Sequence, residues 1–289
     1  MRLLLTGAGG QLGSELVRLV AEHNEERRRG QIDLLACSHA TLDVCRRDQV
    51  MAATLSFEPD VIVHAAAFTA VDACEEEPGR AFAVNALSTR YLAEAARLAS
   101  AHLVYVSTDY VFDGNLGRPY LEWDEPAPLS VYGRSKLAGE KEAGQSATVV
   151  RTAWLMSKTG ANMAKTILRL GRESTGELRF VDDQRGSPTV AADLAAKVLE
   201  LAIARRPGLF HVTNRGEATW FDVAREVMAA AGLGPERVVP ISTDELVPRR
   251  PAARPANSVL ENAVLRLEGD PLLPEWRESL GRLVAAGLA

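Results

Sequence analysis

The 289 residues carry a formal net charge of −5, which provides no positive surface for nucleic acid or for an anionic membrane. Hydrophobic residues make up 47% and charged residues 25%, as in a globular protein with a full core. No apolar run approaches the roughly 18 residues of a membrane span, and Cys37, Cys45 and Cys74 show no paired spacing for disulfides or zinc. We therefore expect a cytoplasmic protein without a nucleic-acid or membrane partner.

Short apolar runs and amphipathic stretches take turns over the first half of the chain. Strands are predicted at five apolar runs, 2–7, 32–37, 59–67, 101–108 and 147–155. Helices are predicted between them, at 11–23, 50–58, 80–100 and 131–141. This alternation is typical of βαβ units and of a parallel sheet covered by helices on both faces. The continuous apolar runs LLL and VIV suit strands that are buried on both sides.

The alternation loosens after about residue 155. Helices are predicted at 160–173, 190–204, 219–232 and 275–287, a strand-like segment at 208–214, and a proline-rich crossing at 247–258. The predicted fold class is α/β, a Rossmann-type doubly wound parallel sheet with a smaller, interleaved C-terminal lobe. We expect residues 1–155, joined by parts of 186–215, to bind a dinucleotide, and residues 156–289 to form mainly the substrate-binding lobe. The charged run 25–29 is expected to be a solvated helix end.

A glycine-rich turn, TGAGGQLG, follows the first predicted strand and precedes the first predicted helix. It places Gly7, Gly10 and Gly13 where glycines permit a tight turn and close approach of a pyrophosphate to the helix N-terminus. The spacing differs from G-x-G-x-x-G, and such a turn can also be purely structural. Its place at the start of an alternating α/β chain favours dinucleotide binding.

Two further strands end in residues that suit a ligand crevice. Ala65, Ala66 and Ala67 leave room for a cofactor at the end of the third strand, although close core packing would also explain them. Thr108 and Asp109 follow the fourth strand, at the carboxyl edge where open α/β sheets bind ligands. A local turn stabilised by these two side chains is the alternative interpretation.

Tyr132 and Lys136 stand four residues apart on a predicted helix, so their side chains are neighbours on one face. A phenol beside an ammonium group is one way to make a tyrosine acidic enough to transfer a proton near neutral pH. The alternative is that Tyr132 packs in the core while the stem of Lys136 covers it. Together with Thr108, which lies 24 residues before Tyr132, the pair favours catalysis.

The glycine turn, the Ser/Thr strand end and the Tyr-x-x-x-Lys helix resemble the extended short-chain dehydrogenase/reductase family. The segments GQLG, AAAFTAVDACEEEP, AVNA, STDYVFDG, VYGRSKLAGE, VRTAW, DDQRGSPT, WFDVA and RPANS narrow the resemblance to the dTDP-4-dehydrorhamnose reductases. The likeness runs from residue 1 to about residue 285. STDYVFDG and RPANS are the more discriminating segments, because Tyr-x-x-x-Lys is shared by the whole superfamily.

The resemblance implies reduction of the 4-keto group of dTDP-4-dehydro-6-deoxy-L-mannose to dTDP-L-rhamnose, with NADPH as cofactor and NADH also used. Tyr132 would be the proton donor, Lys136 would lower its pKa and hold the nicotinamide ribose, and Thr108 would donate to the same substrate oxygen. The implied cofactor-binding residues are Gly7, Gly10, Gln11, Leu12, Gly13, Ser38, Asp43, Ala65, Ala66, Ala67, Tyr132 and Lys136. The implied residues near the dTDP-sugar are Thr69, Thr108, Asp109, Tyr132, Trp154, Arg254 and Asn257. Trp154 could equally be a core aromatic, and Arg254 and Asn257 could instead cap a structured loop.

Selectivity for NAD usually rests on an acidic residue at the end of the second strand. Here Ser38 and His39 follow that strand instead, and the resemblance places Asp43 at the adenine end, so we expect a preference for NADPH. Some relatives bind magnesium through glutamates at a dimer interface. Glu15 matches such a position, but the segment SPTVAADLA offers Asp193 and no second glutamate nearby. No required metal is therefore expected, and the chain could be a monomer or a homodimer.

Two other functions remain open. The chain could be a 4-ketoreductase for a different NDP-6-deoxysugar, because stereochemistry depends on a few pocket side chains. It could also be a non-catalytic, reductase-like regulatory subunit, although an intact set of Thr108, Tyr132 and Lys136 argues against that.

Overall fold

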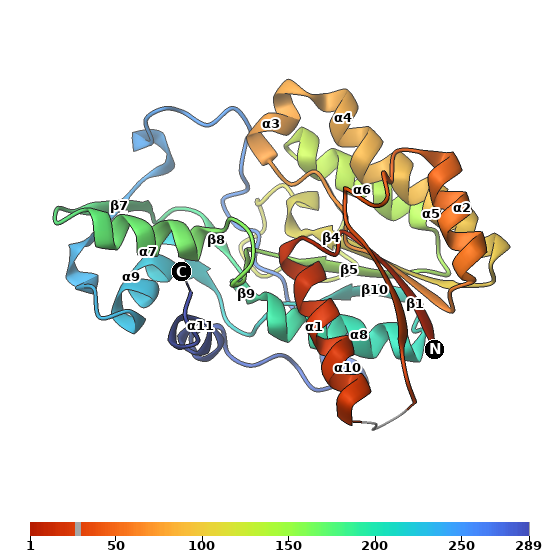
Figure 1. The fold of residues 1–289 in the computed structure, drawn as a ribbon. Helices are drawn as coiled ribbons and strands as arrows, with labels where there is room; N and C mark the ends of the chain where they lie inside the picture. The colour runs from red at the N-terminus through yellow and green to blue at the C-terminus, as the bar shows by residue number, and fades with distance from the viewer. Residues whose placement is uncertain (27–29, 289) are drawn as a thin grey trace.

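The computed structural model describes residues 1–26 and 30–288, so residues 27–29 of the charged run 25–29 lie outside the described residues. A large parallel sheet with helices on both faces lies beside a smaller lobe (Figure 1). Within residues 1–26 and 30–288, no helix is both long and apolar enough to span a bilayer.

The large sheet has the strand order β10-β5-β4-β3-β1-β2, and every neighbouring pair in it is parallel. Its strands are β1 (Arg2–Thr6), β2 (Asp33–Cys37), β3 (Val61–His64), β4 (His102–Thr108), β5 (Thr148–Thr152) and β10 (Gly208–His211). The chain moves to one side of β1 to form β2 and then to the other side to form β3. This reversal creates a switch point at the carboxyl edge between β1 and β3, where open α/β sheets bind ligands.

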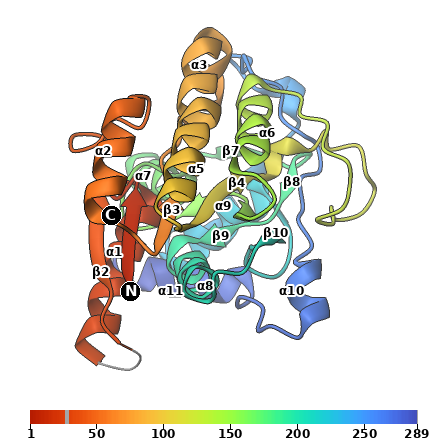
Figure 2. The ribbon, with the colours of Figure 1, turned by 90° about the vertical axis from the view of Figure 1, so that its right-hand side faces the viewer.

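Helices cover both faces of this sheet (Figures 1 and 2). On one face, Leu16 and Val20 of α1 (Gln11–Glu26) pack with Leu194 and Val198 of α8 (Ala191–Ala204). The other face carries α2 (Arg47–Phe57), α5 (Ser88–Leu98) and α6 (Val131–Ala143). The predicted fold class is therefore confirmed, including the burial of LLL and VIV on both sides.

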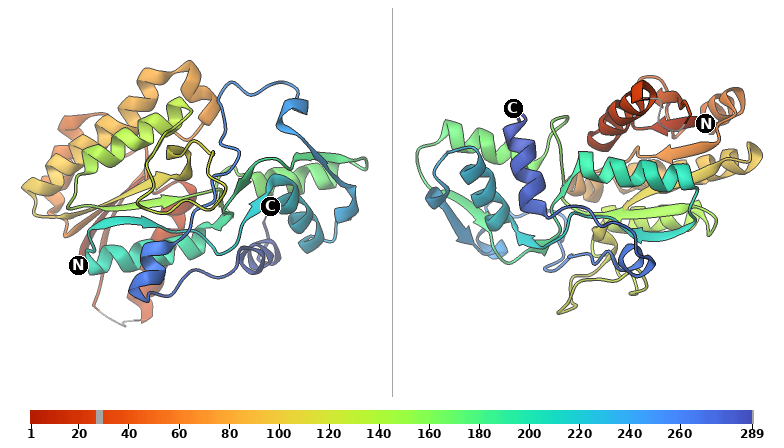
Figure 3. Two further views of the ribbon diagram at one scale, coloured as in Figure 1. Left: turned by 180° about the vertical axis from the view of Figure 1, so that it is seen from behind. Right: turned by 90° about the horizontal axis from the view of Figure 1, so that it is seen from below.

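The smaller lobe projects to one side of the large sheet, as the views from behind and below show (Figure 3). It contains α7 (Met163–Glu173), α9 (Trp220–Ala230), α11 (Trp276–Ala285) and the parallel pair β7 (Leu178–Val181) and β12 (Val238–Ile241). Ile167, Met228 and Leu280 belong to its core. The strand β10 and the helix α8, which come late in the sequence, belong to the large sheet and its covering layer.

Several local elements differ from the sequence prediction. The expected helix 80–100 is divided into α4 (Pro78–Phe82), the π-helical turn η1 (Ala83–Leu87) and α5. The expected strand 59–67 ends at His64, so the three alanines lie beyond the sheet. The elements that were not predicted are all short: α3 (Val71–Glu76), β6 (Leu155–Met156), β7, β8 (Arg185–Gly186), β9 (Thr189–Val190), β11 (Ala218–Thr219), β12, α10 (Ala263–Glu268) and the 3-10 turns η2 (Asp109–Val111), η3 (Pro235–Arg237) and η4 (Thr243–Glu245).

Candidate active site

The glycine turn between β1 and α1 is shaped by close backbone contacts. Gly7 has φ +74°, and a Cβ there would lie 2.6 Å from the Ala66 nitrogen, so only glycine fits without strain. A Cβ on Gly13 would overlap the Gly7 carbonyl oxygen, which shows how closely α1 packs on the turn. A Cβ on Gly10 would meet only the Gly7 oxygen, at 3.3 Å. Gly7 and Gly13 therefore serve the fold, while the exposed Gly10 leaves the outer surface of the turn free.

Three strand ends meet at this turn. The Ala8 amide donates to the Cys37 carbonyl at 3.0 Å, which holds the end of β2 beside the turn. The Ala65 amide donates to the Thr6 carbonyl at 3.3 Å, and the Ala66 amide donates to Thr6 Oγ1 at 3.4 Å. Ala65 and Ala66 therefore lie against the end of β1 and the glycine turn, and Ala67 follows directly in the chain.

His64, the last residue of β3, belongs to the fold. Its Nδ1 lies 2.8 Å from Thr6 Oγ1 and its Nε2 lies 3.0 Å from Ser88 Oγ. Complete burial lowers the pKa of this imidazole to about 3, so it is neutral.

The segment after β2 forms a compact turn. The Ser38 amide donates to Thr41 Oγ1 at 2.9 Å, and the Asp43 carboxylate accepts from the Cys45 amide at 3.0 Å. Ser38 is half-buried, whereas His39 is exposed. Arg47 pairs with Glu94 on α5 instead of turning toward Ser38.

Thr108 closes β4 and caps the 3-10 turn η2. Its hydroxyl accepts from the Tyr110 amide at 3.3 Å and donates to Asp109 Oδ1 at 3.0 Å. Asp109 is buried, and burial raises the pKa of its carboxyl to about 6. In the described part of the chain, its Oδ2 is buried without a hydrogen-bond partner. Ser107 points elsewhere, because its hydroxyl donates to Glu140 on α6.

Two glycines let α6 approach the end of β4. A Cβ on Gly133 would overlap the Tyr110 carbonyl oxygen, and one on Gly139 would overlap the Tyr105 hydroxyl. Ser130 caps the helix by accepting from the Gly133 amide at 3.1 Å. The sequence VYGRSKLAGE thus brings Tyr132 against the strand that ends in Thr108, and the ring of Tyr132 packs edge-on to Tyr110 at a centroid distance of 5.6 Å.

The electrostatics of the Tyr–Lys pair differ from the expectation. Burial raises the pKa of the Tyr132 phenol, and the contribution of the Thr108 hydroxyl only partly opposes that rise. Lys136 Nζ donates to the Val106 carbonyl at 2.6 Å and lies 4.2 Å from the centroid of the Tyr105 ring. Burial lowers the pKa of Lys136 to about 7. In this structure burial therefore raises the pKa of Tyr132, and the expected lowering by Lys136 in the cofactor-bound site stays a prediction.

The predicted sugar-site residues are distributed over both lobes. Thr69 is exposed in the segment between β3 and α3. Trp154 follows β5 with φ +44°, an unusual conformation for a tryptophan, and its ring stacks on Trp220 at 3.8 Å between centroids. Gly186 makes room for it, since a Cβ there would overlap the Trp154 ring. Gln11 contacts the second lobe through its Oε1, which accepts from Ser157 Oγ at 3.1 Å.

The RPANS segment is anchored by two side chains. Arg254 donates to both carboxylate oxygens of Asp72, at 2.8 and 2.7 Å, and this pairing lowers the pKa of Asp72 to about 2. Asn257 donates to the Leu116 carbonyl at 2.7 Å and accepts from the Val259 amide at 3.2 Å. Asn257 therefore stabilises its loop. Arg254 also donates to the Ala252 carbonyl at 2.7 Å, and of its five N–H donors it retains those not used by Asp72 and Ala252.

Sequence reasoning missed Asn85, a buried residue of the π-helical turn. Its side chain accepts from the Phe68 amide at 2.8 Å and donates to the Phe68 carbonyl at 3.1 Å, which fixes the segment before Thr69. It also donates to Ser135 Oγ on α6 at 2.9 Å. The segment AVNA contains the signal, but periodicity predicts an ordinary helix there and hides the π turn.

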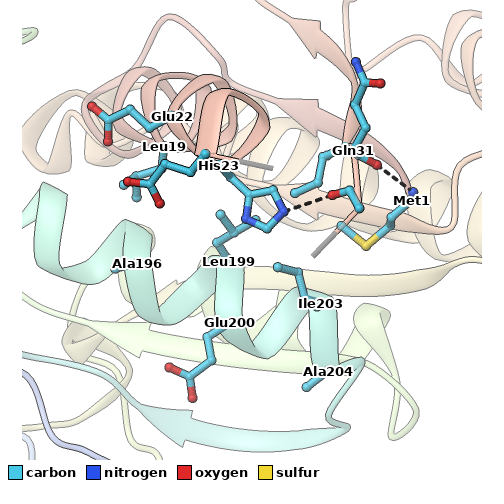
Figure 4. Close-up of a pocket in the computed structure, with 13 residues that line it drawn as sticks. Met1, Leu19, Glu22, His23, Gln31, Ala196, Leu199, Glu200, Ile203 and Ala204 are labelled. Atoms are coloured by element: carbon cyan, nitrogen blue, oxygen red, sulfur yellow. Dashed lines mark hydrogen bonds between the residues drawn. The ribbon is translucent and has the colours of Figure 1, made fainter. Parts of the chain in front are cut away.

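The metal expectation concerned Glu15 and Asp193. Glu15 accepts from Arg18 Nε at 2.9 Å, and Asp193 accepts from Asn214 Nδ2 at 2.8 Å. A separate pocket lies between α1 and α8 (Figure 4), lined by residues that include Met1, His23 and Ile203. Met1 precedes β1, so this pocket is at the amino edge of the sheet, away from Thr108 and Tyr132.

Comparisons with known proteins cover nearly the whole chain. The family described as RmlD substrate binding domain matches residues 1–288. The dTDP-4-dehydrorhamnose reductase of Mycobacterium tuberculosis (strain ATCC 25618 / H37Rv) is 42% identical over 99% of this chain and 93% of its own length. The probable dTDP-4,6-dihydroxy-2-methyloxan-3-one 4-ketoreductase of Streptomyces antibioticus is 44% identical over 97% of this chain and 93% of its own length. The crystal structure of the dTDP-4-dehydrorhamnose reductase of Bacillus anthracis str. Ames, in complex with NADP, is 38% identical, covers 99% of both chains and superposes with a TM-score of 0.91.

Proposed function

The chain belongs to the RmlD substrate binding domain family, and from this membership we propose that it reduces the 4-keto group of dTDP-4-dehydrorhamnose to dTDP-L-rhamnose with NADPH. It is an NAD(P)H-dependent oxidoreductase of the dTDP-4-dehydrorhamnose reductase type. The observation that carries the proposal is the placement of Thr108 and Tyr132 at the carboxyl edge, next to the buried Lys136.

The residues present fit a dinucleotide. The outer surface of the glycine turn is free of side chains at Gly9 and Gly10, and the first N–H groups of α1 have no intrahelical acceptors. The turn and the ends of β1 and β3 converge at the switch point of the sheet. The NADP complex of the Bacillus anthracis relative supports the same cofactor here.

The chain's own residues can carry the proton chemistry. Bound NADPH supplies the hydride. Tyr132 donates its phenolic proton to the alkoxide that develops on the sugar, and its raised pKa keeps the phenol protonated at neutral pH. Thr108 donates a hydrogen bond to the same oxygen once its hydroxyl turns from Asp109 Oδ1 to the substrate, and this bond stabilises charge that grows in the transition state. Lys136 uses one N–H on the Val106 carbonyl and keeps two for the nicotinamide ribose.

A second candidate function is reduction of a different dTDP-6-deoxysugar. The similarity to the Streptomyces antibioticus relative, at 44% identity, favours this candidate as much as the first by sequence alone. Both reactions would use the same Thr108, Tyr132 and Lys136, so the choice depends on side chains around the sugar, such as Thr69 and Trp154.

The proposal includes no required metal.

The test is NADPH oxidation with each keto sugar under identical conditions. We expect the higher kcat/KM with dTDP-4-dehydrorhamnose and dTDP-L-rhamnose as the product. A higher kcat/KM with dTDP-4,6-dihydroxy-2-methyloxan-3-one would favour the second candidate. Turnover of neither sugar by a folded, NADPH-binding protein would reject both. Activity that disappears after chelation and returns with magnesium would overturn the metal-independent part of the proposal.

A further inference from the structure

A buried ion pair begins one helical turn after Lys136 on α6. There Glu140 accepts from Arg151 on β5, with Nε–Oε1 at 2.8 Å and Nη2–Oε2 at 2.7 Å. Only 3% of the Arg151 side chain and 9% of the Glu140 side chain are exposed. Arg90 of α5 and Glu142 of α6 form a similar pair, but their side chains are 60% and 29% exposed. The Glu140–Arg151 pair is therefore removed from solvent, whereas the Arg90–Glu142 pair is not.

Glu140 also connects α6 to the strand that ends in Thr108. Ser107 Oγ donates to Glu140 Oε1 at 2.5 Å, and Ser107 directly precedes Thr108. Ser107 and Arg151 are register partners in the parallel pair of β4 and β5. One carboxylate therefore binds two adjacent strands and fixes the backbone next to Thr108.

The same carboxylate supplies negative charge close to Lys136. Burial disfavours the Lys136 ammonium, and Glu140 opposes that effect by raising its pKa. Other titratable or charged groups that face this region are Tyr132 on α6, the neutral His64 on β3, Tyr105 on β4 and Arg151 on β5. Beyond Arg151 lies His211 on β10. Burial keeps His211 neutral, with a pKa lowered to about 3. Of these described groups, only Glu140 favours the charged form of Lys136.

We infer that Glu140 is a positioning residue for the proposed reduction: it orients Thr108 through Ser107 and keeps the Lys136 ammonium charged where the nicotinamide ribose is held. This inference rests on the proposed function. The alternative is that Glu140 and Arg151 only fasten α6 to the sheet, like any buried ion pair. That alternative predicts that the ionisation of Lys136 does not depend on the charge of Glu140, which gives the experiment its readout.

The first test compares Glu140→Gln with the matched control Glu142→Gln. Glutamine keeps an oxygen acceptor for Ser107 and removes the charge. Since kcat/KM reports the ionisations of the free enzyme, its alkaline limb should move at least about one pH unit lower in Glu140→Gln. At pH values above the alkaline limbs of both proteins, this shift makes kcat/KM of Glu140→Gln about tenfold lower than that of the parent. The control Glu142→Gln should retain the parent profile. A parent-like alkaline limb in Glu140→Gln would overturn the inference.

A second variant covers the case in which Glu140→Gln does not fold, because it leaves the Arg151 guanidinium buried and unpaired. The double variant Glu140→Gln/Arg151→Met removes both charges. A fastening role predicts that this variant regains the parent pH profile. The inference predicts that the limb stays at lower pH, because the charge that favoured protonated Lys136 is still missing.

The pH dependence of NADPH binding, followed by fluorescence, separates this inference from the choice of sugar. The alkaline limb of binding should move in the same direction in Glu140→Gln, without any sugar present. If the parent turns over neither sugar and the binding limb still moves, the proposed substrate fails and the inference about Glu140 stands. If the parent reduces the sugar and neither limb moves, the inference fails and the proposed function stands.

Discussion

Tyr132 combines burial with a position next to Thr108, and both properties matter for the direction of the proposed reaction. A donor that must be protonated at the start of each turnover benefits from the raised pKa that burial gives. An alkoxide is a much stronger base than a phenolate, so the proton transfer remains favourable. Burial of Lys136 has the opposite consequence, because it moves the ionisation of that ammonium group close to neutral pH.

Replacing Tyr132 with phenylalanine should keep the packing against Tyr110 and remove the proton donor. We expect kcat to fall by about 10²–10⁴-fold with NADPH binding unchanged, as is typical when a general acid is lost. Steady-state kinetics and a cofactor titration measure the two quantities. Turnover within about threefold of the parent would show that Tyr132 is only a packing residue.

Lys136 also affects how stability depends on pH. Its pKa is lowered in the folded chain to about 7, from the usual 10.5 of a lysine in water. Between these values the unfolded chain binds more protons, so this group makes the free energy of unfolding rise with pH, by up to about 1.36 kcal/mol per pH unit. Its destabilising effect is fully present below about pH 7 and is relieved as the pH rises through this range.

Lys136→Met should therefore remove that rise between about pH 7 and pH 10, and urea unfolding at several pH values would measure it. Lys141→Met is the control, because Lys141 is exposed on the same helix and should leave the slope unchanged. An unchanged slope in Lys136→Met would mean that Lys136 is not desolvated.

At the scale of elements, the residues of the glycine turn have different roles, some in the fold and one in the proposed dinucleotide binding. Gly7 and Gly13 are required by contacts within the chain, whereas Gly10 faces outward. Gly10→Val should therefore weaken NADPH binding by tenfold or more and change the unfolding free energy little, because the side chain intrudes on the surface that approaches a pyrophosphate. Gly13→Ala is a contrasting variant, which should destabilise the fold itself. Parent-like NADPH affinity in a folded Gly10→Val protein would contradict the assignment of the turn.

The elements also show what the sequence could and could not predict. Periodicity identified β1, α1, β3, β4 and α8, because each buries a continuous run or one helical face. It failed at the π turn around Asn85 and at short strands such as β8, which depend on tertiary contacts. In the candidate site, a strand end and a helix spacing pointed to Thr108 and Tyr132. Asp72 was not predicted, since its partner Arg254 lies 182 residues away, and Glu140 was not predicted, since its partners lie on two different strands.

In the whole molecule, the glycine turn lies at the carboxyl edge of the large sheet, and the residues proposed for the sugar site lie on segments of both lobes. Gln11 at the start of α1 and Ser157 of the lobe are hydrogen-bonded, and Arg254 is held by Asp72 of α3. Ligands that bind across this region should stabilise the folded chain as a unit. The stabilisation follows RT ln(1 + [L]/Kd), so the free energy of unfolding at a fixed ligand concentration reports relative affinity for the two dinucleotides.

The last prediction is a preference for NADPH over NADH. The turn after β2 presents Ser38 and the exposed His39 and no carboxylate directly at the strand end, so a 2′-phosphate meets possible donors and no repelling charge there. We expect kcat/KM to be about tenfold higher with NADPH, which corresponds to ~1.4 kcal/mol. If binding accounts for the difference, saturating NADPH should raise the unfolding free energy by about the same amount more than NADH at equal concentration. The kinetic and the unfolding measurements should be made at one ionic strength, because a phosphate contact is weakened by salt. An NADH preference in either measurement would contradict the assignment of Ser38 and His39, and Ser38→Asp should reverse the preference if it is correct.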